Sequence, residues 1–270
     1  MHGARFVKSI CKLLVHMALA GALVSMMPRA AGASEITFLC AAALESWIVA
    51  VIPEFERTSG YTVKPAFQII SDITERVRKG DAADLAIVSP PQWEALQRES
   101  KLDPAVRVVI AKVGYGVFVR KGAAKPDIGS VEAFKRAFLN AGSIAFFPGA
   151  RGPTGAYQVR VFEQLGIGAD IKPKIKYSGA AKPNQVVSAP LFELVANGEA
   201  DIGVAMISEI LQAPGVDLVG PVPLELRDFI VFTTGLPVNA REPTGAKALI
   251  AYLTSPKAAS ILKSRGLEEP

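Results

Sequence analysis

Two hydrophobic patterns alternate along the chain from residue 35 onward. Short apolar runs rich in β-branched residues are separated by longer segments in which apolar residues recur every three or four positions. In the segment 44–58 this spacing gives one apolar face, made of Leu44, Trp47, Ile48, Val51, Ile52 and Phe55. The alternation predicts an α/β fold in which helices flank mostly parallel sheet.

The pattern predicts elements along the whole length after residue 34. Strands are expected at 35–41, 62–67, 84–88, 115–120, 143–147, near 175, and at 201–206, 216–219 and 229–234. Helices are expected at 44–58, from 71 to Gly80, from Pro90 onward, and at 130–139, 154–165, 189–196, 243–253 and 256–263. Because no low-complexity linker separates them, two lobes would be joined by ordered crossing strands. The best candidates are 111–120 and 226–234.

The amino terminus has the pattern of a secretory signal peptide. Basic residues at Arg5, Lys8 and Lys12 precede an apolar run from 13 to 27, and small residues end at Ala33. A retained anchor is the alternative, but the run is about 15 residues long and a bilayer span needs about 20. We therefore predict cleavage after Ala33 and an exported, soluble mature chain. Neither cysteine follows the pattern that precedes a lipidated cysteine.

Composition changes the picture once that segment is set aside. The 270 residues include 30 Lys and Arg against 25 Asp and Glu, but removing residues 1–33 lowers the net charge from +5 to +1. Both histidines and Cys11 leave with it, so Cys40 is the remaining cysteine. This excludes Ser-His-Asp and Cys-His centres, an intramolecular disulfide and the usual zinc sites. It also removes the electrostatic support for nucleic-acid binding, and no cofactor or metal is expected.

Several short motifs occur in an order typical of one family. They are Ile36-Thr37 with Cys40-Ala41-Ala42-Ala43-Leu44, Phe55-Glu56 with Thr58-Ser59-Gly60, Gly80-Asp81-Ala82-Ala83-Asp84-Leu85, Pro153-Thr154-Gly155-Ala156-Tyr157, Gly198-Glu199-Ala200-Asp201-Ile202-Gly203-Val204, and the segment 248–256. With these motifs the chain resembles the periplasmic solute-binding proteins of ABC importers, of the molybdate-binding type. The resemblance extends over nearly all of the mature chain.

The resemblance implies a two-lobed, Venus-flytrap fold with two hinge strands and a ligand held in the cleft. One lobe would comprise 34–112 plus 226–270, and the other 113–225. Ligands of such α/β folds bind at the carboxyl ends of strands, where helix N-termini offer free N–H groups to an anion. The three loops that fit this description are 42–44, 70–72 and 151–154.

The first two loops depart from the molybdate-binding pattern. The resemblance puts Ala43 and Ile70 where the family has serine hydroxyls, although Ser71 could supply one hydroxyl if its loop shifts. At roughly 0.5–3 kcal/mol for each hydrogen bond, two missing hydroxyls would lower the affinity for an oxyanion by about one to four factors of ten. The apolar replacements favour a small organic anion over molybdate.

The third loop adds a cation. Arg151 lies between two glycines and could bind a carboxylate through both guanidinium N–H groups, or it could be a solvated loop residue. Thr154 could bind the ligand or use its hydroxyl to cap the following helix. The resemblance also places Ser188 and Met206 at the site, with core packing as the alternative for Met206. Cys40, in an apolar strand beside the Ala42 turn, is expected to be a buried and inert thiol, with a role in the cleft left open.

The leading hypothesis is a monomeric periplasmic receptor, not an enzyme, that closes on a small anionic solute and delivers it to an ABC permease in the inner membrane. The alternative is an enzyme on the same scaffold, such as an isomerase of unsaturated tricarboxylic acids, which some relatives of this family are. Without histidine, proton transfer would fall to Asp72, Tyr157 or a lysine. A ligand-sensing partner of a membrane signalling protein is a third possibility.

Overall fold

The computed structural model describes residues 34–148, 152–182 and 188–270. Residues Glu35–Pro270 form one compact unit. The predicted signal peptide with its cleavage after Ala33 lies outside the described residues, and so does Arg151. No helix in the described ranges is both long and apolar enough to cross a membrane.

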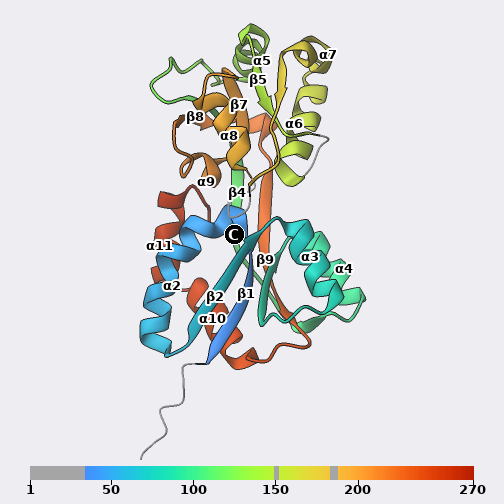
Figure 1. Ribbon diagram of the computed structural model, residues 1–270, viewed down its shortest axis with the longest axis vertical. Helices are drawn as coiled ribbons and strands as arrows, with labels where there is room; N and C mark the ends of the chain where they lie inside the picture. Colours follow the sequence, from blue (N-terminus) through green and yellow to red (C-terminus); the bar gives the residue numbers. More distant parts are fainter. Residues whose placement is uncertain (1–33, 149–151, 183–187) are drawn as a thin grey trace, which may run out of the picture. The chain divides into compact units, whose positions relative to one another are not determined.

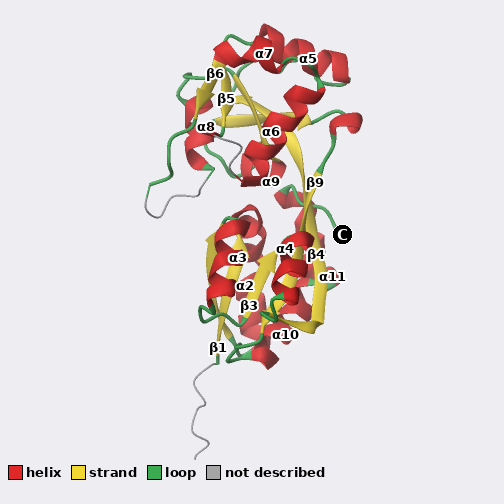
Figure 2. Cartoon of the chain, turned by 90° about the vertical axis from the view of Figure 1, so that its right-hand side faces the viewer, coloured by secondary structure: helices red, strands yellow, loops and turns green. Residues whose placement is uncertain are grey.

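A mixed sheet of nine strands forms the framework (Figures 1 and 2). The strands are β1 (Glu35–Ala41), β2 (Thr62–Gln68), β3 (Leu85–Val88), β4 (Leu102–Arg120), β5 (Ile144–Phe146), β6 (Ile175–Tyr177), β7 (Ile202–Met206), β8 (Val216–Pro221) and β9 (Phe229–Pro237). Their order is β2-β1-β3-β9-β4-β7-β5-β6, and β8 pairs with β4. The pairs β1–β2, β1–β3, β5–β6 and β5–β7 are parallel. Each antiparallel pair among the described strands involves β4 or β9.

The long strand β4 connects the two halves of this sheet. It pairs with β9 as far as Gly114 opposite Phe229, and with β7 from Tyr115 opposite Met206. The sequence predicted a crossing strand here but placed its pairing segment at 115–120, whereas the strand begins at Leu102. The second predicted crossing segment enters β9 after a 3-10 turn at Leu224–Leu226. The lobe boundaries at 112 and 226 stay a prediction.

Helices fill the connections between the strands. They are α2 (Glu45–Ser59), α3 (Ile70–Lys79), α4 (Pro90–Arg98), α5 (Val131–Asn140), α6 (Gly152–Gln164), α7 (Gly168–Ile171), α8 (Ala189–Ala196), α9 (Ile207–Ile210), α10 (Pro243–Leu253) and α11 (Pro256–Leu262). Hydroxyl caps begin two of them: Ser130 accepts from the Ala133 N–H (3.1 Å) and Ser255 from the Ala258 N–H (3.3 Å). The sequence missed α7 and α9, which are too short to show a helical period.

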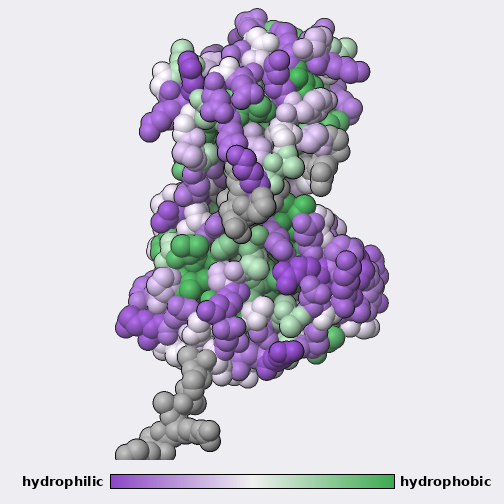
Figure 3. Space-filling model, viewed as in Figure 1, coloured by the Kyte–Doolittle hydropathy of each residue, from purple (hydrophilic) through white to green (hydrophobic). Residues whose placement is uncertain are grey.

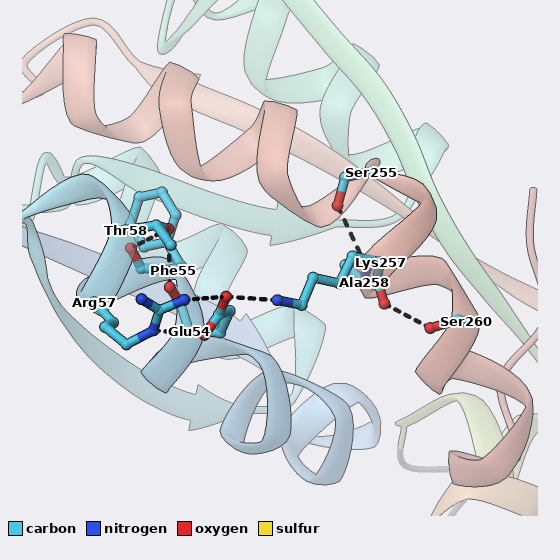
Figure 4. Close-up of polar contacts among 8 residues, drawn as sticks. All are labelled: Glu54, Phe55, Arg57, Thr58, Ser255, Lys257, Ala258 and Ser260. Atoms are coloured by element: carbon cyan, nitrogen blue, oxygen red, sulfur yellow. Dashed lines mark hydrogen bonds and ion pairs between the residues drawn. The ribbon is translucent and has the colours of Figure 1, made fainter.

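The apolar face of α2 packs into the core, as its spacing predicted. Trp47 is fully buried, and its indole N–H donates to the Ala258 carbonyl (2.9 Å), which ties α2 to α11. On the exposed side of the same contact, Glu54 lies between Arg57 and Lys257 (Figure 4). Its two cationic partners lower the pKa of Glu54 to about 2. These exposed ion pairs add little to the stability that the buried face supplies.

Candidate ligand-binding site

Two cavities lie beside each other in the unit Glu35–Pro270. The first, here called the cleft cavity, has a volume of about 170 Å³, and the second, the side cavity, has about 460 Å³. Small-molecule sites usually measure about 300–1,000 Å³, so the side cavity falls in this range and the cleft cavity alone does not. Ala42, Ser188 and Glu209 line both of them.

The cleft cavity is built from the carboxyl ends of strands in both halves of the sheet. Ala42 follows β1, Ile69 follows β2, Phe147 follows β5, and Met206 is the last residue of β7. Parallel strands bring their carboxyl ends to one edge, which is where open α/β sheets bind ligands. The expected location of the site is therefore formed by loops that the sequence separates widely.

Three of the predicted site residues line the cleft cavity: Thr154, Ser188 and Met206. Helix α6 begins at Gly152, so Thr154 lies within the first turn rather than before it. Its hydroxyl is buried and accepts and donates no hydrogen bond, so the interpretation that capping uses it is wrong. The Ser188 hydroxyl is likewise buried without a hydrogen-bond partner. Met206 is 7% exposed at the end of its strand.

The other predicted site residues lie elsewhere. Ala43 lines the side cavity, and Ile70 and Ser71 line neither cavity, because Ile69 takes that place in the cleft cavity. The Ser71 side chain is exposed and its hydroxyl faces the Asp72 carboxylate at 3.5 Å. The loop therefore supplies neither cavity with a hydroxyl. Arg151 falls outside the described residues.

The first half of the sheet presents acids where an anionic ligand would need positive potential. Glu45 occupies the first turn of α2 and Asp72 the first turn of α3. A carboxylate there interacts with the same helix N-terminus that an anionic ligand would use. Burial raises the pKa of Glu45, which lines the side cavity.

Glu209, which the sequence pattern did not single out, is the titratable residue that lines both cavities. It belongs to the four-residue helix α9, and its Oε2 atom is buried without a hydrogen-bond partner. Burial raises the pKa of this carboxyl to about 7, and the nearby Ser188 hydroxyl opposes that rise without forming a hydrogen bond of good geometry. Two polar residues, Ser208 and Glu209, come just after the buried strand that ends at Met206. This was the signal that could have identified it.

Two glycines fix the position of α9. A methyl group at Gly116 of β4 would lie 2.9 Å from the Ile207 side chain, and one at Gly266 would lie at the same distance from another Ile207 atom. Gly266 also has a φ of 71°, a backbone conformation that residues other than glycine rarely adopt. Close packing against both sides of Ile207 therefore holds Glu209 in its buried position two residues later.

The residues expected to transfer protons are not in the cavities. The Tyr157 hydroxyl donates to the Leu226 carbonyl (2.9 Å), its ring stacks on Tyr115 with centroids 3.8 Å apart, and burial raises its pKa. Asp72 is exposed and lines neither cavity. Neither Tyr157 nor Asp72 lines the cleft cavity or the side cavity, and a part for either in proton transfer stays a prediction. The fully buried Cys40 lines neither cavity, and burial followed by a smaller effect of Glu45 raises the pKa of its thiol.

The part of the chain that the structure describes contains no cluster of metal-ligating side chains. No group of three or more histidine, cysteine, aspartate or glutamate side chains comes together there in a way that could hold an ion. What the two cavities offer are hydroxyls, apolar surface, the carboxyls of Glu45, Glu193 and Glu209, and the guanidinium of Arg265.

Comparison with known proteins identifies relatives over nearly the full length. The sequence profile of a family described as "Bacterial extracellular solute-binding protein" matches residues 36–268. An aconitate isomerase of a Pseudomonas species is 26% identical over 260 residues, covering 93% of this chain and 95% of that protein. The molybdate-binding protein ModA of Azotobacter vinelandii is 24% identical over 256 residues, covering 89% and 92%.

Solved structures confirm the fold. The substrate-binding domain of a putative molybdenum ABC transporter from Clostridium difficile superimposes with a TM-score of 0.70 at 16% identity, covering 88% of this chain and all of that one. The periplasmic molybdate-binding protein of Azotobacter vinelandii gives 0.70 at 18% identity, covering 87% and 99%. The predicted two-lobed periplasmic-binding-protein fold and the resemblance to the molybdate-binding type are both confirmed.

Proposed function

The chain belongs to the family of bacterial extracellular solute-binding proteins, and from this premise we propose that it binds a small organic acid. Family membership implies a periplasmic location, a small solute and an ABC permease as partner. The preference for an organic acid over molybdate is the specific part of the proposal. In this proposal the chain is a monomeric receptor whose lobes close on the ligand.

The buried Glu209 carboxyl carries this proposal. Below its pKa of about 7 the group is neutral and can donate a hydrogen bond, and a ligand carboxylate is a strong acceptor for it. The hydroxyls of Ser188 and Thr154, also without partners, can donate to the same ligand. A buried polar group without a partner costs about 1–3 kcal/mol, so a ligand that satisfies these groups recovers that free energy on binding.

The rest of the cleft cavity favours a ligand with carbon atoms. Its lining includes the apolar residues Ile69, Phe147, Pro153 and Met206. A fully ionised tetrahedral oxyanion would gain nothing from contact with them. A short hydrocarbon chain that carries carboxylates matches both kinds of surface.

Lobe closure needs a flexible connection, and the strand pairing supplies a place for it. The change of partner between Gly114 and Tyr115 of β4 is where one half of the sheet ends and the other begins. A small rotation there would bring Ala42 and Ile69 toward Thr154 and Ser188. Ligand contacts made to both sides would stabilise the closed form.

Isothermal calorimetry tests the proposal directly. Protein purified from the periplasm of an expressing bacterium is titrated with molybdate, tungstate, sulfate and a series of mono-, di- and tricarboxylic acids. We expect a carboxylic acid to bind with a dissociation constant near or below about 1 µM, corresponding to about 8 kcal/mol. Tight molybdate or tungstate binding with no response to any carboxylic acid would contradict it.

A second candidate function, isomerisation of an unsaturated organic acid, is favoured by the same carboxyl. A group with a pKa near 7 suits general acid–base catalysis, and the Pseudomonas relative is named an aconitate isomerase. In such a step Glu209 would take a proton from a carbon beside the double bond, the double bond would shift, and the same proton would return to the carbon at its far end. The reaction needs no co-reactant.

Glu209→Gln separates the two candidates. If the chain is an isomerase, incubation with unsaturated tricarboxylic acids yields product, and the variant lowers turnover by about 10²- to 10⁴-fold while it still binds the acid. If the chain is a receptor, no product forms with either protein. Glu163→Gln, which removes an exposed carboxylate at the end of α6, is the matched control and leaves both readouts unchanged.

A further inference from the structure

The side cavity contains a set of polar groups that the proposed site in the cleft cavity does not use. Ser46 comes from α2, Ser208 from α9, and Arg265 from the 3-10 turn Lys263–Arg265 near the carboxyl terminus. The Oγ atoms of both serines and the Nε atom of Arg265 are buried without hydrogen-bond partners. Residues from three separate segments that line one cavity thus carry unpaired buried polar atoms, and Glu45, Glu193 and Glu209 line the same cavity.

The burial of these groups makes the observation informative. Ser208 is only 2% exposed, so water at the surface cannot satisfy its hydroxyl. Arg265 forms no ion pair or hydrogen bond with any side chain that the structure describes. Native proteins leave few buried polar groups unpaired, and a cluster of them around one cavity indicates an occupant.

We propose that the side cavity is the second half of the ligand site and that Arg265, with Ser46 and Ser208, receives a further carboxylate of an organic acid that carries at least two. This inference rests on the proposed function, which it deepens by naming the class of ligand as a di- or tricarboxylate. One carboxylate lies in the cleft cavity beside Thr154 and Ser188, and another lies in the side cavity beside Arg265.

The residues between the cavities suit the middle of such a ligand. Ala42, Ser188 and Glu209 line both, so a molecule that extends from one cavity to the other passes these three side chains. Ala42 leaves room for the carbon chain, while Ser188 and Glu209 offer polar groups along its course. The larger side cavity adds apolar surface from Val49, Ala50 and Phe192. Figure 3 shows an apolar area over α2, the helix to which Val49, 55% exposed, belongs.

The chemistry of Arg265 suits a carboxylate. A guanidinium donates two parallel N–H groups that match the two oxygens of a carboxylate, and it stays charged at any pH the protein meets. The hydroxyls of Ser46 and Ser208 can donate to the remaining lone pairs. A monocarboxylate held in the cleft cavity would leave Arg265 unpaired.

The chain just after the Arg265 turn is hydrogen-bonded to β4. Just after Arg265, the backbone of Glu268 exchanges two hydrogen bonds of 2.9 Å with Lys112 of β4. Lys112 lies two residues before the point at which β4 changes its pairing partner. A carboxylate bound by Arg265 therefore links the ligand to the strand on which lobe closure depends.

Calorimetry of matched acids tests the inference. A monocarboxylate, a dicarboxylate and a tricarboxylate of similar carbon skeleton are titrated into the wild type, Arg265→Gln and Ser208→Ala. We expect Arg265→Gln to weaken the di- and tricarboxylates by about 10- to 100-fold and Ser208→Ala by about 3- to 10-fold, with the monocarboxylate unchanged. Lys263→Gln, which removes an exposed cation from the same turn, is the matched control and leaves every affinity unchanged.

The outcomes separate this inference from the proposal on which it rests. If the wild type binds di- and tricarboxylates and Arg265→Gln binds them equally well, the inference is wrong and the proposed function stands. If the wild type binds none of the acids, both fall. Thermal unfolding of each variant shows whether it is folded, and Ser208→Ala decides the matter should Arg265→Gln fail to fold, because its hydroxyl makes no contact that folding needs.

Discussion

Buried polar groups differ in their hydrogen bonding between two regions of the molecule. They have partners where β4 crosses between the two halves of the sheet, and they lack partners around the cavities. At the crossing, the Tyr157 hydroxyl donates to the Leu226 carbonyl and its ring stacks on Tyr115. Around the cavities, the hydroxyls of Ser188 and Ser208 and the Oε2 atom of Glu209 are buried without hydrogen-bond partners. Both regions are equally shielded from water, so the difference is not one of exposure. The proposed function accounts for this contrast, because the groups around the cavities would find their hydrogen-bond partners in the ligand.

The largest effect is expected where the polar group is paired. Tyr157→Ala removes a fully packed ring together with its hydrogen bond, and it should lower the free energy of unfolding by about 3–5 kcal/mol. Denaturant unfolding followed by circular dichroism measures this. The control is Tyr177→Ala, whose ring is 58% exposed and whose loss should cost less than about 1 kcal/mol. Equal losses in the two variants would remove the distinction drawn for Tyr157.

The second prediction concerns the carboxyl of Glu209. Its ionisation lowers the stability of the fold, whereas the Tyr157 side chain raises it. Burial raises the pKa of Glu209 from 4.5 to about 7, so the unfolded chain ionises first and stability falls as pH rises through that window. Glu209 should lower the unfolding free energy of the wild type by about 2–3 kcal/mol between pH 4.5 and 7, and Glu45, whose pKa burial also raises, adds a decline of the same sign. Glu209→Gln should flatten most of this decline.

Unfolding titrations at several pH values, with Glu163→Gln as the control, check that expectation. The control should keep the full decline, because Glu163 is exposed at the end of α6. A pH dependence unchanged in Glu209→Gln would mean that the carboxyl is solvated and does not face the cavities as described.

Ser→Ala variants test the same contrast between paired and unpaired groups, with smaller expected changes in stability. Ser130→Ala and Ser255→Ala remove hydroxyls that cap helices and should each cost about 1 kcal/mol of stability. Ser188→Ala and Ser208→Ala remove buried hydroxyls without partners and should raise stability, because each unpaired group costs about 1–3 kcal/mol. Thermal unfolding of the four variants measures the difference. Losses of the same size in all four would show that Ser188 and Ser208 have structural roles.

The smallest effect belongs to the exposed ion pairs. Arg57 and Lys257 lower the pKa of Glu54 to about 2, so its ionised form stabilises the fold above pH 4.5, and that contribution is lost as pH falls toward 2. Because these charges are solvated, Glu54→Gln should change stability near neutral pH only slightly. Acid unfolding curves of the variant and wild type should therefore differ at low pH more than near neutrality. A large loss at neutral pH would contradict this.

Local patterns in the sequence predicted most of the fold. The bounds of α8 and α10 match the predicted 189–196 and 243–253, because apolar spacing and flanking Pro, Gly and Asn residues define both helices locally. The first part of β4 escaped prediction because Asp103, Pro104 and Arg107 interrupt its apolar pattern, and the strand is specified by its pairing with β9. Pairing between distant segments leaves little trace in a local window.

The site was less predictable, for a physical reason. Thr154, Ser188 and Met206, which were predicted as ligand-binding residues, line the cleft cavity. Glu209 and Arg265 belong to a four-residue helix and a single 3-10 turn, and their importance depends on what surrounds them rather than on their neighbours in sequence. Burial and missing partners are properties of the folded chain. A sequence shows that a glutamate follows a strand, but not that no hydrogen-bond donor reaches it.

The uptake of protons on binding tests the central claim most directly, that a carboxylic acid binds beside Glu209. A calorimetric titration with a tricarboxylate at about pH 8, repeated in buffers of different ionisation enthalpy, measures that uptake. The ligand's negative charge raises the pKa of Glu209 further, so the wild type should take up close to one proton per ligand and Glu209→Gln close to none. Equal proton uptake by the two proteins, or binding of molybdate in place of the acid, would contradict the account.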